Sequence, residues 1–106
     1  MSPEPTALRL AKEYRRRLSL VLKRPVRVTL FGSQARGDAV LGSDIDLFVI
    51  LPNLEKSTLD TALDVAWEIG FNAGAVLSVV PATKSEIARL KASPFYQAVQ
   101  REGVAV

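Results

Sequence analysis

The sequence predicts one small α/β domain in which helices pack against a mixed β-sheet. Its 106 residues suit a single domain spanning residues 1–106, and 48% of them are apolar, which is enough for a modest core. Three short apolar runs, each followed by glycine or proline, predict strands, and segments with helical apolar spacing flank them. The predicted order is helix, strand, turn, strand, helix, strand, helix, helix, which suits a three-stranded mixed sheet.

The first half of the chain alternates between helical and strand patterns. Residues 7–22 carry apolar side chains at helical spacing and most of their Lys and Arg off that stripe, which predicts an amphipathic basic helix. Residues 26–31 alternate as a strand that stops at Gly32, and residues 33–36 suit a short helical turn. Residues 44–51 predict a second strand whose later part is wholly apolar, so it should be central and covered on both faces.

The second half predicts a further helix and the third strand. Residues 57–69 have helical periodicity, and Ser57 stands at capping-box spacing from Asp60. The predicted buried stripe consists of Leu59, Ala62, Leu63, Ala66 and Ile69/Gly70. Residues 75–80 predict the third strand, which Pro81 ends.

Two capping patterns position the last helices. Thr83 and Glu86 have the spacing of a capping box. Ser93 suits an N-cap, and Pro94 suits the first residue of a helix that runs to about residue 102. The final Val-Ala-Val either adds a short strand or frays.

The residue types that are missing exclude several kinds of chemistry. The chain has no cysteine and no histidine. This excludes disulfides, Cys/His zinc sites, thiol nucleophiles and histidine-based triads. Any metal site must use oxygen ligands, which favours hard cations such as Mg²⁺ or Mn²⁺.

Charge is unevenly distributed along the chain. Residues 1–36 hold nine Lys/Arg and two Asp/Glu, whereas residues 37–106 hold five and nine. The basic part either faces an anion, such as nucleotide phosphates or nucleic acid, or forms a solvated helix face. No apolar run approaches the roughly 20 residues of a membrane span, and the N-terminus lacks a signal-peptide pattern, so we expect a soluble cytoplasmic protein.

Two aspartates open the second predicted strand. Asp44 and Asp46 are two residues apart, and side chains at that spacing in a strand point to the same face. Two such carboxylates repel each other, and a divalent cation that takes their oxygens as ligands neutralises both. The alternative is that both acids are solvent-exposed at the strand end.

A glycine turn ends the preceding strand. Gly32 and Ser33 join that strand to a helical turn, where unpaired backbone N–H groups attract phosphate and the serine hydroxyl adds a donor. A plain turn that Ser33 caps is the alternative. Together with Asp44 and Asp46, these two residues supply donors for a polyphosphate and acids for its metal ion.

The segment GSQARGDAVLGSDIDLFVI resembles the signature of the nucleotidyltransferase superfamily that includes DNA polymerase β. In that signature Gly-Ser is followed after about ten residues by Asp-x-Asp. The pattern of the smallest members, the minimal nucleotidyltransferases, is matched by Gly32, Ser33, Arg36, Gly37, Ser43, Asp44, Ile45, Asp46 and Leu47. The ending SPFYQAVQREGV also resembles theirs, so the likeness covers nearly the whole chain.

The resemblance implies the nucleotidyltransferase palm fold and a role for each matched residue. Gly32 and Ser33 would hold the β- and γ-phosphates of ATP or another NTP. Asp44 and Asp46 would bind Mg²⁺ or Mn²⁺ and act as the catalytic residues. Arg36 would pair either with phosphate or with Asp38.

Ser43 completes the nucleotide-binding set that the resemblance implies, and its contribution is to orient the neighbouring Asp44. Active members of the superfamily usually carry a third carboxylate on the next strand. Here the matching position is Ser78, which is neutral near pH 7 and cannot serve as a base or a strong Mg²⁺ ligand. The resemblance therefore leaves catalysis open.

The resemblance also implies a partner. Minimal nucleotidyltransferases often act as antitoxins beside a small helical HEPN protein, in some cases by transferring AMP to its tyrosine. Exposed apolar residues around Phe95, Tyr96 and Val99 would either dock that partner or pack against the chain's own sheet. A degenerate domain that neutralises the partner by binding alone is the alternative function, and nucleic-acid binding through the basic first helix is a weaker one.

Overall fold

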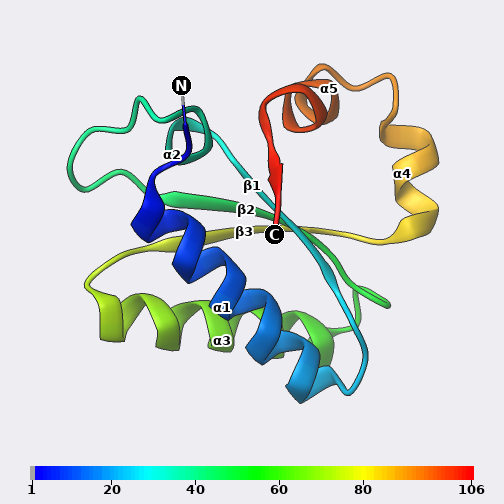
Figure 1. The fold of residues 1–106 in the computed structure, drawn as a ribbon. Helices are drawn as coiled ribbons and strands as arrows, with labels where there is room; N and C mark the ends of the chain where they lie inside the picture. Colours follow the sequence, from blue (N-terminus) through cyan, green and yellow to red (C-terminus); the bar gives the residue numbers. More distant parts are fainter. Residues whose placement is uncertain (1) are drawn as a thin grey trace.

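The computed structural model describes residues 2–106, which form a four-stranded sheet with helices on both faces (Figure 1). The helices are α1 (Pro5–Leu22), α2 (Ser33–Arg36), α3 (Lys56–Ala73), α4 (Lys84–Leu90) and α5 (Pro94–Glu102). The strands are β1 (Arg27–Phe31), β2 (Ile45–Ile50), β3 (Leu77–Ala82) and β4 (Val104–Ala105). This confirms the predicted mixed α/β fold.

The sheet has the strand order β3-β2-β1-β4. Strand β1 runs antiparallel to β2 and β4, whereas β2 and β3 are parallel and joined by α3. The prediction of three strands was therefore one short, because the C-terminal Val104 pairs with Leu30 and Ala105 pairs with Thr29. The chain end adds a short strand and does not fray.

One face of the sheet packs against α1 and α3, which lie side by side below it in Figure 1. Alternate residues of the strands, including Leu30, Leu47 and Val49, are fully buried on this face. Tyr14 of α1 lies between the two helices and its hydroxyl donates to the Ala62 carbonyl of α3 at 3.0 Å. Burial raises the pKa of the Tyr14 phenol, so the hydroxyl remains a donor.

The opposite face of the sheet carries an aromatic cluster under α5. Phe95 of α5 meets Phe31 and Phe48 edge to face, with ring centroids 5.5 and 6.4 Å apart. Tyr96 lies 5.7 Å from Phe48, and Val99 is buried. The chain's own sheet therefore takes up Val99 and contacts both rings, while Phe95 remains 46% exposed, so docking of a partner there stays a prediction.

Helix α3 departs from its predicted pattern. It begins at Lys56 after Glu55, so Ser57 is not its N-cap. Leu63, which the pattern assigned to the core, is 51% exposed, whereas Thr58 and Val65 are buried. The reason is that the buried stripe turns toward α1 and leaves a second apolar row on the opposite flank of the helix.

The capping patterns of the last two helices are confirmed. The Thr83 amide donates to Glu86 Oε1 at 3.0 Å, which completes a capping box at α4. Ser93 Oγ accepts from the Tyr96 amide at the start of α5, and Pro94 is its first residue. No helix among residues 2–106 has both the length and the apolar character needed to cross a bilayer.

Candidate functional site

The predicted site residues meet at one end of the sheet, on the face that carries α5. Asp46 lies in β2 between two neighbours in register, Phe31 of β1 and Ser78 of β3. Gly32 follows Phe31 directly and leads into α2. The ladder therefore brings the glycine turn beside the second aspartate, as the sequence predicted.

Gly32 lies in direct contact with the carboxylate of Asp46. Its φ is +77° and its ψ −160°, a conformation that is essentially confined to glycine. A Cβ built on Gly32 would overlap Asp46 Oδ2, so a larger residue would displace the carboxylate. The turn therefore needs glycine at this position, both for its backbone conformation and for the space that the Asp46 carboxylate occupies.

The first residues of α2 place backbone N–H donors at the same end of the sheet. The amides of Ala35 and Arg36 both donate to the Gly32 carbonyl at 3.1 Å, so the hydrogen bonds of the turn begin with Ala35. The amides of Ser33 and Gln34 precede them and have no acceptor within the turn. Together with the Ser33 hydroxyl they form a group of donors suited to phosphate oxygens.

The two aspartates differ in their surroundings. Asp44 is exposed. The sequence predicted a strand that begins at Asp44, but β2 begins one residue later, at Ile45. Asp46 is half-buried, and its pKa is raised first by burial and second by the charge of Asp44, while Arg36 lowers it. Without a cation, the ionised form of Asp46 is therefore disfavoured in the folded protein.

The donor set suits one divalent cation. Among residues 2–106 no group of three carboxylate, imidazole or thiol side chains is close enough to hold a metal ion. Ser78 stands directly beside Asp46 in the parallel ladder, where a third carboxylate would have to lie. Mg²⁺ is commonly held by one or two carboxylates together with water and substrate phosphate, so Asp44 and Asp46 fit that role.

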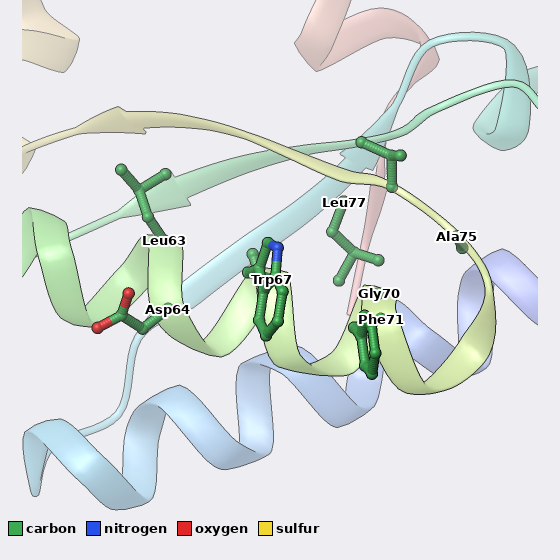
Figure 2. A pocket seen from close by; sticks show the side chains of 9 residues that line it. Leu63, Asp64, Trp67, Gly70, Phe71, Ala75 and Leu77 are labelled. Atoms are coloured by element: carbon green, nitrogen blue, oxygen red, sulfur yellow. The ribbon is translucent and has the colours of Figure 1, made fainter.

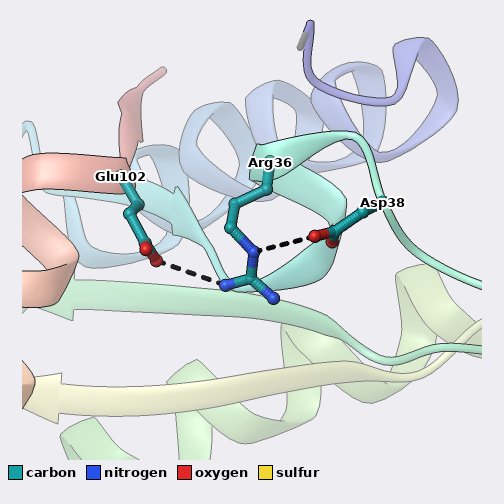
Figure 3. Close-up of polar contacts among 3 residues, drawn as sticks. All are labelled: Arg36, Asp38 and Glu102. Atoms are coloured by element: carbon teal, nitrogen blue, oxygen red, sulfur yellow. Dashed lines mark hydrogen bonds and ion pairs between the residues drawn. The ribbon is translucent and has the colours of Figure 1, made fainter.

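Arg36 is held at the edge of the site by two acids (Figure 3). Its Nε donates to Asp38 Oδ2 and its Nη1 to Glu102 Oε2, both at 3.2 Å. These partners raise the pKa of the guanidinium, with Asp38 the larger cause. The structure shows the pairing of Arg36 with Asp38, and its pairing with phosphate stays a prediction.

Glu102 and Gln34 are two residues of the site that the sequence did not indicate. Glu102 lies 66 positions from Arg36 in the chain, and no local spacing signals such a contact. The side-chain nitrogen of Gln34, Nε2, donates to the Ser43 carbonyl at 3.0 Å and so fixes the loop before Asp44. Ser43 thus takes part through its backbone carbonyl, which the Gln34 side chain holds next to Asp44.

Comparison with known families agrees with this geometry. The model of the nucleotidyltransferase domain family matches residues 8–102. The chain therefore belongs to the nucleotidyltransferase domain family. The comparisons with curated proteins and with solved structures found no match.

Family membership supports a general activity, the transfer of a nucleoside monophosphate, with an NTP and a divalent cation as the usual requirements. The mixed sheet and its helices agree with that fold. Gly32, Ser33, Arg36, Ser43, Asp44 and Asp46 all lie within the matched residues.

Replacing Gly32 by alanine should disrupt the site. Gly42 provides the matched control, because it also has positive φ, +86°, but has no atom within 4 Å of a built Cβ. We expect Gly42→Ala to lower the free energy of unfolding by about 1 kcal/mol, and Gly32→Ala to lower it by roughly 3 kcal/mol. Urea denaturation measures both, and equal losses would contradict the contact between Gly32 and Asp46.

Replacing Asp46 by asparagine should stabilise the ligand-free protein. A carboxyl whose folded pKa is raised gives its full stabilising contribution below the unfolded pKa, near 3.8, and loses it as pH rises through the folded value. At neutral pH ionised Asp46 therefore destabilises the fold, and Asp46→Asn removes that effect. Thermal unfolding at pH 7 without metal should show a higher midpoint for the variant, and a lower one would contradict the assignment.

Proposed function

We propose that the protein is a Mg²⁺-dependent nucleotidyltransferase that moves NMP, in the simplest case AMP from ATP, onto a hydroxyl group. One observation carries the proposal: the turn at Gly32 touches the carboxylate of Asp46. The hydrogen-bond donors suited to phosphate and the acids suited to a metal ion therefore lie close enough for one metal-bound nucleotide to contact both. A domain without a nucleotide would gain nothing from an acid whose ionised form is disfavoured where it stands.

Each residue then has a defined part. The Ser33 and Gln34 amides and the Ser33 hydroxyl would bind the β- and γ-phosphates. Asp44 and Asp46 would hold the divalent cation, which neutralises phosphate charge and aligns the α-phosphate for in-line attack. In the transfer a bond forms between the acceptor oxygen and the α-phosphorus, and the bond to pyrophosphate breaks.

Within residues 2–106 no third carboxylate stands beside Asp44 and Asp46 to take the proton of the acceptor hydroxyl. Ser78 beside Asp46 is neutral near pH 7 and cannot take the proton. The proton would pass to water or to a group that the acceptor carries. This favours an acceptor that completes the site, and a macromolecule can do so more readily than a small alcohol.

We propose a small helical HEPN-type protein as that acceptor, with the present chain as its antitoxin. The support is the resemblance of residues 32–50 and 93–104 to the minimal nucleotidyltransferases. Modification of a hydroxyl on the partner would neutralise it.

Ser78 also supports a second function. A domain that lacks the third carboxylate could bind and neutralise the same partner without transferring a nucleotide. The two functions differ in whether Asp44 and Asp46 are needed for neutralisation.

The test is incubation of the protein with α-labelled ATP, Mg²⁺ and the product of the neighbouring gene as the candidate partner. We expect label on the partner, and a fall of at least about 100-fold in the double variant Asp44→Asn/Asp46→Asn, because metal assistance supplies several kcal/mol. Gel autoradiography and mass measurement follow the transfer. Neutralisation that survives in the double variant, with no label in the wild type, would reject transfer and support binding alone.

Ser78→Asp provides a gain-of-function arm of the same experiment. A general base contributes roughly 10²–10⁴-fold to a rate, and the new carboxylate would lie beside Asp46. We expect Ser78→Asp to raise the transfer rate over that of the wild type by about 10²-fold, the lower end of this range. Ser85→Asp, an exposed position on α4, is the control for added negative charge and should leave the rate unchanged.

A further inference from the structure

One hollow on the molecule lies away from the acids. It lies between α3 and the edge strand β3, measures about 550 Å³, and is lined mainly by apolar side chains (Figure 2). Leu77 of β3 points into it, whereas the next residue, Ser78, lies on the opposite face of the sheet beside Asp46. The hollow and the acids are therefore separated by the thickness of one strand.

A row of large apolar side chains forms one wall of this hollow. Leu63, Trp67 and Phe71 follow one another at intervals of four along α3 and are 51%, 68% and 71% exposed. The rings of Trp67 and Phe71 stack with centroids 5.1 Å apart and planes 16° apart, so they hold each other in place. Exposed aromatic rows that are ordered before binding are typical anchors of interaction surfaces.

Small residues form the floor beside that row. Ala66 and Gly70 lie one row closer to the sheet, and a Cβ on Gly70 would overlap the Ala75 carbonyl. Ala66 and Gly70 are themselves buried, so a second helix would pack its own ridge mainly alongside Leu63, Trp67 and Phe71. We call this surface, made of Leu63, Ala66, Trp67, Gly70 and Phe71, the α3 groove.

The edge of β3 is poorly suited to adding a strand. The carbonyls of Val76 and Ala82 accept hydrogen bonds from β2, so alternation directs the polar groups of Leu77, Val79 and Pro81 outward. Pro81 has no N–H to offer, and a proline at this position blunts a sheet edge. The α3 groove therefore favours a helix over an extended peptide.

The charge at the groove indicates what the helix carries. Asp64 is the one charged residue among those lining the hollow, and no ion pair of Asp64 occurs within residues 2–106. Asp60 lies one turn earlier, but it is already paired with Lys56 at 2.7 Å, so Asp64 carries the charge argument. Within the described part of the chain the hollow is lined by no Lys or Arg, so a second copy packed groove against groove would offer Asp64 no cation, whereas Lys or Arg on a partner helix would be attracted to it.

We propose that the α3 groove docks an amphipathic helix of a partner protein whose apolar ridge is flanked by Lys or Arg. The apolar ridge packs beside Trp67 and Phe71, and the basic flank faces Asp64. This inference goes beyond nucleotidyl transfer, because the groove uses none of the residues assigned to nucleotide or metal. A helix bound there lies just around the β3 edge from Asp46, next to the position that Ser78 leaves without an acid.

The test uses the fluorescence of Trp67, the only tryptophan in the chain. Two tryptophan-free synthetic peptides of about 18 residues, long enough for helix formation, carry Leu at helical spacing with either Lys or Glu elsewhere. We expect the Lys peptide to shift Trp67 emission to the blue and to protect it from acrylamide. The Glu peptide should bind at least about tenfold more weakly.

Three variants assign the binding to the α3 groove. Leu63→Asp should weaken the Lys peptide by about tenfold or more, whereas Leu20→Asp, at a 65% exposed position on α1, should not change its binding. Asp64→Lys should reverse the preference between the peptides. The double variant Asp44→Asn/Asp46→Asn should bind the Lys peptide normally, so loss of transfer and loss of docking are distinguishable.

Each contrary result overturns the proposal. Equal affinity for both peptides, no emission change with either, or unchanged binding by Leu63→Asp would show that the groove does not select a basic helix. Sedimentation of the wild type as a dimer that Leu63→Asp converts to a monomer would show that a second copy covers the surface instead.

Discussion

The contact between Gly32 and the carboxylate of Asp46 is the constraint on which the site depends. It exists because β1 and β2 are antiparallel neighbours, with Phe31 in register with Asp46, and because Gly32 takes a backbone conformation that only glycine readily adopts. The fully buried strand residues on the α1/α3 side keep that register, since a slip by one residue would turn the acid into the core. The stability of the core and the geometry of the site are thus linked.

The pattern of the sequence was enough for the elements and for the pair of motifs. Period-two and helical spacings indicated three of the strands and the helices, whereas the pairing of β1 with β2 is seen in the structure. Two contacts could not be predicted from the sequence. The pairing of Val104 with Leu30 rests on only two residues, and the Arg36–Glu102 contact depends on where α5 ends in space.

Helix α3 shows why periodicity alone misplaced Leu63. The helix has apolar residues on two flanks, and a hydrophobic pattern does not tell which flank meets the sheet. Packing of Tyr14 onto Ala62 and the Arg17–Glu68 ion pair at 2.9 Å fix the rotation. The row of Leu63, Trp67 and Phe71 is thereby left at the surface, next to the edge of β3.

The number of bound cations tests the central claim most directly. Electron paramagnetic resonance of Mn²⁺ reports free and bound ion and can be titrated with and without ATP. A site of two carboxylates beside a phosphate-binding turn predicts one Mn²⁺ per chain whose binding tightens when ATP is present. Binding that is unaffected by ATP, or that persists in Asp44→Asn/Asp46→Asn, would contradict the account.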